Sequence, residues 1–194
     1  NNGVYVVNYF NGAVYNVYNS SDVLSSAIAD LNTSTQDYVV TSYTNVGNHN
    51  WSVLYDNESS VLYGLGITND CTGVYVSGTL HNLSSTAGGS TINSVHDNFL
   101  LSKLDKTTGS EVWLKDFNST IDHEDHFVGI DVDDYGNLYA VGRLAGTNAV
   151  LGTDLNFTSG QAHSEVMIAH FFTDGSFQDF EVLPGTDDSW GMSI

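Results

Sequence analysis

Positive charge is almost absent from this sequence. Only four of its 194 residues are basic, against 23 acidic residues, and the formal net charge is −19. A chain with this balance repels phosphate, so we expect no nucleic-acid partner and no binding to anionic membrane surfaces. The apolar residues come in short runs, none near the ~20 residues that cross a bilayer as a helix, so no transmembrane segment is expected.

Proline and cysteine are equally scarce, with one residue of each. The single Cys71 excludes an intrachain disulfide and falls in a predicted turn, where we assign it no role. Charged residues make up only 14% of the chain, below the ~25% of ordinary soluble domains. The surface must therefore be polar through Asn, Ser, Thr and Tyr. This composition favours an extracellular protein in an acidic or otherwise harsh medium, and a plain acidic soluble domain is the alternative.

Sequons for N-linked glycosylation are frequent. Seven Asn-x-Ser/Thr sites occur, at Asn19, Asn32, Asn50, Asn57, Asn82, Asn118 and Asn156. All but Asn50, which adjoins the predicted strand at Trp51, fall at or near predicted turns and loops. Together with the missing basic residues, they predict an extracellular or cell-surface glycoprotein. Neither a signal peptide nor an initiator Met is present, so we expect a processed chain or part of a longer one.

Short apolar runs divided by turn residues fill the segment from Asp97 to Leu144. It holds four runs of strand length, and Gly109 and Gly136-Asn137 stand in turns, where these residues adopt a positive φ at little cost. The block recurs upstream: Trp51 and Trp113 are 62 residues apart, and Tyr75 and Tyr139 are 64 apart. It recurs downstream from Val166, and Tyr5 precedes Tyr75 by 70 residues. Repeats of this length, with four strands each, are typical of β-propeller blades.

The repeat resembles the bacterial and archaeal family named for its seven-bladed β-propeller repeat (SBBP-like repeats). The matching residues are Asp97, Phe99, Lys103, Leu104, Asp105, Gly109, Trp113, Asp131, Gly136, Asn137, Tyr139 and Gly142. The run from Lys103 to Trp113 is also similar to quinoprotein-type propeller repeats. The upstream copy has Ser42-Tyr43 where the pattern has Lys-Leu, and the downstream copy lacks the Trp. The resemblance implies a fold, and no single function follows from it.

We therefore predict an all-β fold of β-propeller-like blades, each with four antiparallel strands. Residues 1–194 form one propeller-type domain or propeller segment of about three blades, with repeats at roughly 1–35 (partial), 36–95, 96–162 and 163–194 (partial). The chain is cut out of phase with the blades, since it starts on a fourth strand and ends on a third. Closure into a small ring, a six-bladed ring of two copies, strand sharing between copies, and a longer propeller are all open.

Some local features are predicted as well. Ser21 to Leu31 has a helical rhythm of apolar residues, which predicts a short helix, with an irregular crossing segment as the alternative. The links from Thr79 to His96 and from Arg143 to Ser164 are interpreted as crossings between blades. Continuous apolar runs such as Phe99-Leu100-Leu101 predict strands buried on both faces. Trp51, Trp113 and the repeated Tyr residues are interpreted as packing between blades, with sugar stacking as the alternative.

Two acidic segments are candidate metal sites. His123 and His126 lie in an Asp-His-Glu-Asp-His run that is otherwise a solvated turn. Asp131, Asp133 and Asn137 have part of the spacing of a Ca²⁺ loop, but Tyr135 stands at a ligand position, so a plain β-turn is the preferred interpretation. Apart from Ca²⁺ at these residues, no cofactor is expected.

No catalytic motif stands out, and we assign no catalytic residue. The predicted function is that of an extracellular, glycosylated structural or adhesive repeat protein in a larger surface assembly or filament. Its partners would be copies of itself or neighbouring subunits, which would bind through blade edges. A secreted propeller enzyme acting on polysaccharide, and a Ca²⁺- or carbohydrate-binding propeller module, are the alternatives.

Overall fold

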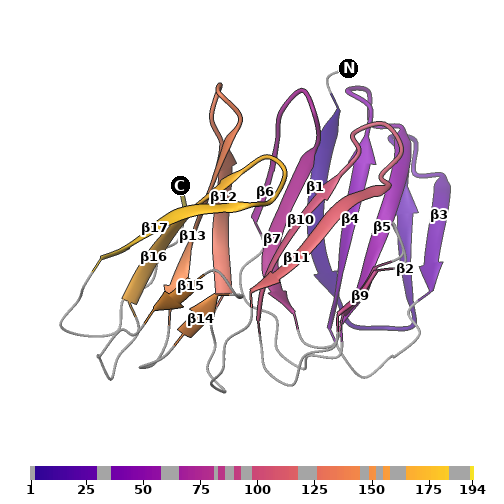
Figure 1. Ribbon diagram of the computed structural model, residues 1–194. Coiled ribbons are helices and arrows are strands. Elements are labelled where there is room, and N and C mark those ends of the chain that lie inside the picture. The colour runs from indigo at the N-terminus through magenta and orange to yellow at the C-terminus, as the bar shows by residue number, and fades with distance from the viewer. Residues whose placement is uncertain are drawn as a thin grey trace.

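The computed structural model is built of antiparallel β-sheets (Figure 1). It describes residues 3–29, 36–57, 66–80, 83–85, 90–92, 98–117, 126–144, 149–151, 155–157, 165–183 and 193–194. Seventeen strands occur in these segments: β1 (Val4–Phe10), β2 (Val14–Tyr18), β3 (Leu24–Ala29), β4 (Asp37–Tyr43), β5 (His49–Asn57), β6 (Gly66–Asn69), β7 (Val74–Leu80), β8 (Leu83–Ser85), β9 (Thr91–Ile92), β10 (Asn98–Leu104), β11 (Glu111–Phe117), β12 (His126–Val132), β13 (Asn137–Leu144), β14 (Ala149–Leu151), β15 (Leu155–Phe157), β16 (Glu165–Phe172) and β17 (Phe177–Leu183). Within these segments no helix is long and apolar enough to cross a membrane.

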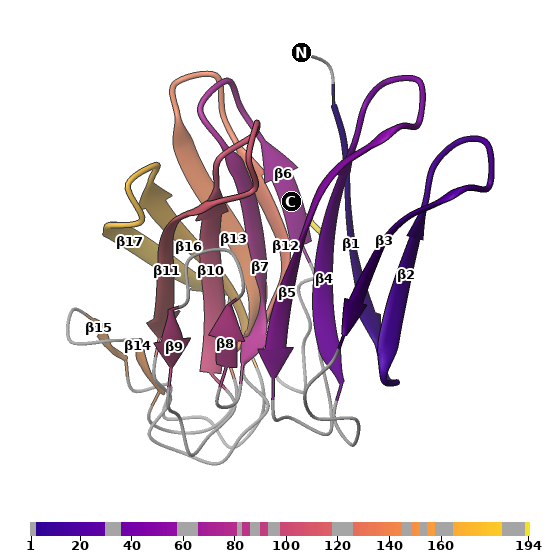
Figure 2. The ribbon, with the colours of Figure 1, turned by 90° about the vertical axis from the view of Figure 1, so that its right-hand side faces the viewer.

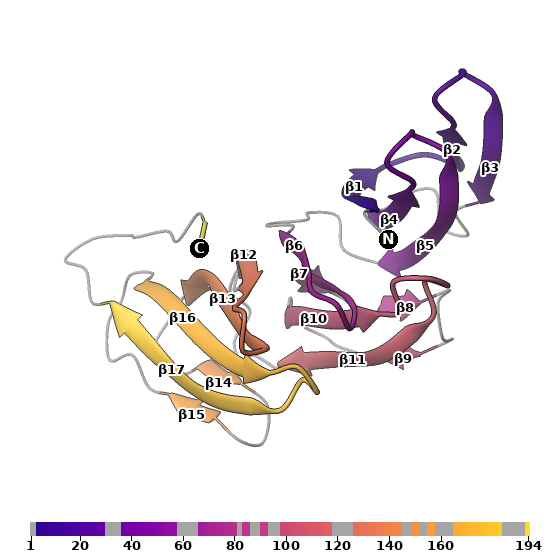
Figure 3. The ribbon, with the colours of Figure 1, turned by 90° about the horizontal axis from the view of Figure 1, so that it is seen from above.

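Three larger sheets stand side by side (Figure 3). Sheet I has the order β1-β4-β5-β8-β9, sheet II β6-β7-β10-β11, and sheet III β12-β13-β16-β17. Strands β1, β6 and β12 lie on one side of the row, and β11 and β17 lie on the other. The hairpins β2–β3 and β14–β15 form two further small sheets, and β2–β3 lies at the outer end of the row, beyond sheet I (Figure 2). The all-β prediction is confirmed.

The core fills the two spaces between the three sheets. Leu100 of β10 belongs to the cluster between sheets I and II, whereas its neighbours Phe99 and Leu101 belong to the cluster between sheets II and III. All three side chains are fully buried. The apolar run is continuous because sheet II is covered on both faces, as predicted.

The phase of the repeats was predicted wrongly. The four strands between Asp97 and Leu144 do not form one sheet: β10 and β11 belong to sheet II, whereas β12 and β13 begin sheet III. The long links after Thr79 and Arg143 join neighbouring strands of the same sheet and contain the hairpins β8–β9 and β14–β15. A sequence repeat gives the number of residues per sheet but not the point at which the chain crosses to the next sheet. The prediction placed the crossings at the long links, and this was wrong.

The helix predicted near Ser21 is also wrong. Residues Leu24–Ala29 form β3, which pairs with β2 through Val14↔Ala29 to Tyr18↔Leu24. The turn between the two strands is closed by Asn19, whose Oδ1 accepts hydrogen bonds from the backbone N–H groups of Ser21 and Val23. This side-chain bond starts a hairpin, a local alternative that competes with helix formation.

Candidate functional site

Each of the three sheets has an equivalent set of three residues that lie opposite one another on three neighbouring strands, which we call a cross-strand triplet. Tyr5, Tyr75 and Tyr139 are each opposite a residue of the next strand, and that residue is opposite one on the strand after it. The triplets are Tyr5–Ser42–Trp51 in sheet I, Tyr75–Lys103–Trp113 in sheet II and Tyr139–His170–Asp179 in sheet III. The Tyr and Trp residues that recur in the sequence therefore lie at equivalent positions of the sheets.

In sheets I and II, the Trp of the triplet contacts a turn of the next sheet and so connects the two sheets. Trp51 Nε1 donates a hydrogen bond to the Lys106 carbonyl at 3.1 Å, and its ring lies against Gly109, where an added Cβ would be 2.7 Å from the ring. Gly109 has a φ of 73°, in the left-handed region, so glycine serves both the turn and the close approach. We call this arrangement a Trp joint.

Sheets II and III are connected by a second Trp joint. Trp113 Nε1 donates to the Thr173 carbonyl at 3.1 Å, and a Cβ on Gly175 would be 3.1 Å from the ring. Gly175 has a φ of 80°. The two Trp residues thus pack between sheets, as predicted, and link successive sheets by equivalent contacts.

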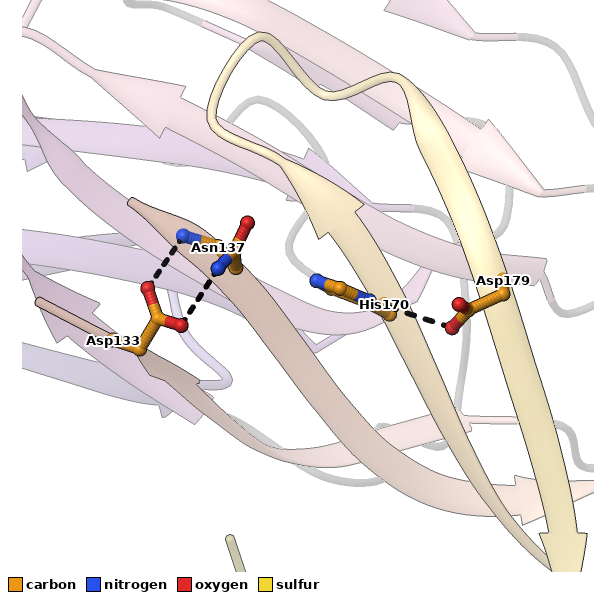
Figure 4. Close-up of polar contacts among 4 residues, drawn as sticks. All are labelled: Asp133, Asn137, His170 and Asp179. Carbon is orange, nitrogen blue, oxygen red and sulfur yellow. Dashed lines mark hydrogen bonds and ion pairs between the residues drawn. The ribbon is translucent and has the colours of Figure 1, made fainter. Parts of the chain in front are cut away.

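The two ends of the row depart from this pattern. In sheet III, Asp179 replaces the Trp and lies 3.4 Å from Nδ1 of His170 (Figure 4). The His170 ring stacks on the Tyr139 ring, with 4.4 Å between the ring centres. The buried Nε2 of His170 has no hydrogen-bond partner among the described residues. At the other end, in sheet I, Ser20 covers the turn that contains Gly47. Ser20 donates its backbone N–H to the Gly47 carbonyl at 3.0 Å, and its side chain packs on Gly47.

A charged cluster lies beside the second Trp joint. Lys103 is almost fully buried, and its Nζ donates to Thr72 Oγ1 at 2.9 Å and lies 5.0 Å from the centre of the Tyr75 ring. Burial and the neighbouring Asp70 carboxylate raise the pKa of Tyr75 to about 12. Burial acts to raise the pKa of Asp70 as well, but hydrogen bonds from Thr72, Gly73 and Tyr75 outweigh it and lower that pKa. The lowered pKa keeps the Asp70 carboxylate charged at neutral pH.

A polar pocket of about 280 Å³ opens beside the first Trp joint. Lys106 Nζ lies 5.9 Å from the centre of the Tyr5 ring and donates to Asn69 Oδ1 and to the Asp70 carbonyl. The pocket is lined by Gly3, Tyr5, Thr44, Asn45, Asn50, Lys106 and Thr107. An aromatic ring with amides, hydroxyls and one ammonium group around it could hold a small polar ligand such as a sugar.

The predicted calcium ligands have separate partners. Asp133 accepts hydrogen bonds from Asn137 through both N–H and Nδ2, at 2.8 and 2.7 Å (Figure 4). These bonds lower the pKa of Asp133. Asp131 Oδ1 instead accepts from Thr68 Oγ1 of β6 at 2.9 Å. The segment thus forms the β-turn that we preferred.

The side chains of the two histidine candidates cannot be placed relative to that turn. His123 lies outside the described residues, and so does the side chain of His126 at the start of β12. Among the residues that the structure describes, no group of three His, Cys, Asp or Glu side chains could hold a metal ion.

The sequons are spread over several elements. Asn19 stands in the β2–β3 turn, and Asn50 is exposed on β5 at the pocket. Asn57 and Asn156 lie on β5 and β15, but their side chains are outside the described residues, as are Asn32, Asn82 and Asn118 altogether. Glycosylation at the seven sites remains a prediction.

A close backbone approach on the inner side of the row was not predicted. A Cβ built on Gly66 of β6 would lie 3.0 Å from the Ile130 nitrogen of β12, and one on Gly129 of β12 would lie 3.0 Å from the Ser193 Cα. The sequence carried a signal for it, because Gly66, Gly129 and Gly191 each follow a large apolar residue at the start of the same short motif. Glycine permits backbones to approach each other in this way.

Comparison with known proteins assigns the chain to no group. No family model matches it, and no curated protein matches its sequence.

Proposed function

We propose that this chain is a structural subunit of an extracellular, glycosylated surface assembly, and that its sheets are propeller-type blades. The blade assignment is supported by the four-stranded antiparallel order of sheets II and III and by their face-to-face packing. It is also supported by the residues behind the family resemblance, because Gly109 and Trp113 lie at the joints between sheets. Repetition of one joint along a row is typical of proteins that extend by stacking.

The observation that carries the structural role is the exposure of large apolar side chains at the sheet I end of the row. Six large apolar side chains there are 49–65% exposed: Val4, Tyr9, Val14, Tyr18, Val23 and Leu24. They lie on β1, on the β2–β3 hairpin and in its turn, at one end of the molecule (Figure 2). We propose that a protein contact covers these exposed side chains.

The test is the native mass by light scattering, measured beside the denatured mass before and after enzymatic removal of N-linked glycans. We expect native particles of several chains and a denatured chain that loses mass on deglycosylation. Val14→Ser with Leu24→Ser should lower the native mass, whereas Val112→Ser, which is 56% exposed on β11, should leave it unchanged. A monomer at all concentrations would refute the structural role, and an unchanged denatured mass would refute glycosylation.

A carbohydrate-binding module is the second candidate, because of the Tyr5 pocket. Tyr5, Asn45 and Asn50 offer an apolar ring face and amide groups within one hollow. Binding to a glycan array that is lost in Tyr5→Ala and kept in Tyr135→Ala would favour it. Tyr135 is the matched control because its side chain is exposed and lies in a turn outside the pocket.

A further inference from the structure

We infer that the Tyr5 pocket takes a sugar that carries a carboxylate group, and that the Lys106 ammonium group binds this carboxylate. The inference rests on the second candidate function, carbohydrate binding, and specifies the class of ligand. A uronic acid residue within a polysaccharide is the simplest ligand of this kind.

The pocket lies where sheet I departs from the pattern of sheet II. In sheet II, the Lys103 side chain lies over the Tyr75 ring, with Nζ 5.0 Å from the ring centre, and reaches Thr72. The equivalent residue of sheet I is Ser42, because Ser42 is opposite Tyr5 as Lys103 is opposite Tyr75. The Ser42 side chain is too short to extend over the Tyr5 ring, so space remains beside this ring.

A β-bulge directs Asn50 toward this space. The pairing of β4 with β5 shifts between Ser42↔Trp51 and Tyr43↔His49, which leaves Asn50 as the extra residue. Asn50 Nδ2 donates a hydrogen bond to Ser42 Oγ at 3.3 Å, and Asn50 lines the pocket. Bulges re-aim side chains in this way. The exposed amide group of Asn50 can therefore bind sugar hydroxyl groups beside the Tyr5 ring.

Lys106 supplies a positive charge that forms no ion pair among the described residues. Its Nζ donates to Asn69 Oδ1 at 3.1 Å and to the backbone carbonyl of Asp70, and both acceptors are uncharged. An ammonium group has three N–H donors, so one remains for a ligand. No Asp or Glu is among the described residues that line the pocket, although the chain has 23 acidic residues. An anionic group is therefore the complement of this site.

The charge of Asp105 acts on the same site in the opposite direction. Burial and then the Asp105 carboxylate raise the pKa of Tyr5. The carboxylate belongs to its own turn, where Asp105 Oδ1 accepts hydrogen bonds from the backbone N–H groups of Thr107 and Thr108. Neutralisation of Lys106 and of Asp105 should consequently change the affinity for an anionic sugar in opposite directions.

A second hollow continues the pocket past Lys106. It has a volume of about 340 Å³ and is lined by Tyr5, Cys71, Lys106 and Thr107. All of these except Cys71 also line the first hollow of about 280 Å³. A ligand of more than one sugar ring can thus place its carboxylate at Lys106 and a ring in each hollow. The free thiol of Cys71 is exposed and can report whether the second hollow is occupied.

The test compares one oligosaccharide in two charge states, an oligomer of galacturonic acid and the same oligomer with its carboxylates methyl-esterified. All proteins carry Ser52→Ala, which removes the sequon at Asn50, so that no glycan on Asn50 fills the pocket. Calorimetry at neutral pH should show that the acid form binds about 10- to 100-fold more tightly than the ester, because the ester loses one charge-assisted hydrogen bond. Lys106→Met should remove this preference by weakening only the acid form, whereas Lys106→Arg should keep it.

Two further variants and one chemical probe serve as controls. Lys115→Met removes the same charge from an exposed residue of β11 outside both hollows and should leave both affinities unchanged. Asp105→Asn keeps Oδ1 as the acceptor of the turn and should strengthen binding of the acid form. Alkylation of Cys71 by iodoacetamide should be slowed by the acid oligomer and not by the ester at the same concentration.

The outcomes separate this inference from the candidate function on which it rests. Binding that depends on Tyr5 but shows no preference for the acid form would overturn the role of Lys106 and leave a carbohydrate-binding module. A preference for the acid form that persists in Lys106→Met would also overturn it, because the carboxylate would then be bound elsewhere. Absence of binding to any glycan would refute both.

Discussion

Replacement of Gly109 by Ala tests whether the Trp joint holds the sheets together. An Ala at a φ of 73° costs about 1–2 kcal/mol in the left-handed region. Its methyl carbon would lie 2.7 Å from the Trp51 ring, and insertion of a methyl group into a packed contact adds about 1–3 kcal/mol. We expect Gly109→Ala to lower the free energy of unfolding by about 2–5 kcal/mol, as the sum of these two terms.

Substitutions at two further glycines separate the cost of the left-handed backbone from the cost of the close contact with the Trp ring. Gly136 has a φ of 84°, but a Cβ there would meet only Thr173 Cγ2 at 3.4 Å, an ordinary contact. Gly136→Ala should therefore show the backbone cost alone. Gly175 is intermediate, because its Cβ would be 3.1 Å from Trp113. Urea unfolding should rank the losses as Gly109→Ala, Gly175→Ala, Gly136→Ala, and equal losses at all three would refute the Trp joint as a tight contact.

Two more changes address the hydrogen bonds near these joints. Trp113→Phe keeps a ring but removes the bond from Nε1 to the Thr173 carbonyl, which should cost about 0.5–1.5 kcal/mol in urea unfolding; no loss would show that the bond is replaced by water. Asp70 has a pKa lowered in the folded state, so its contribution to stability is present above the unfolded pKa of about 3.9 and is lost as the pH falls through the folded value. Asp70→Asn should therefore weaken the acid-induced loss of stability, measured as the urea midpoint between about pH 5 and 2, and an unchanged pH profile would contradict this assignment.

Local chemistry made the turns and the burial pattern predictable from the sequence. Gly109 and Gly136 have positive φ values because each turn needs a left-handed residue, and this need can be read from one short segment. The run Phe99-Leu100-Leu101 lies in two cores, and its continuity alone indicated burial on both faces. These features depend only on residues close in the sequence.

The point at which the chain crosses between sheets was not predictable in this way. The link after Leu80 stays within sheet II although it is long, because it carries β8 and β9, and β8 pairs with sheet I. The link after Phe117 crosses to sheet III. Both links are rich in polar residues and have no distinguishing local signal, so only the tertiary pairing of β6 with β7 and of β12 with β13 determines the phase.

The repeat also fails at particular residues. Trp51 and Trp113 each pack on a glycine of the next sheet, whereas Asp179 stands at the equivalent position of sheet III and lies 3.4 Å from Nδ1 of His170. In sheet I, Ser20 packs on Gly47, the glycine of the equivalent turn. A sequence period predicts which positions are equivalent but not which side chains meet there, so these two departures could be recognised only after the strands were paired.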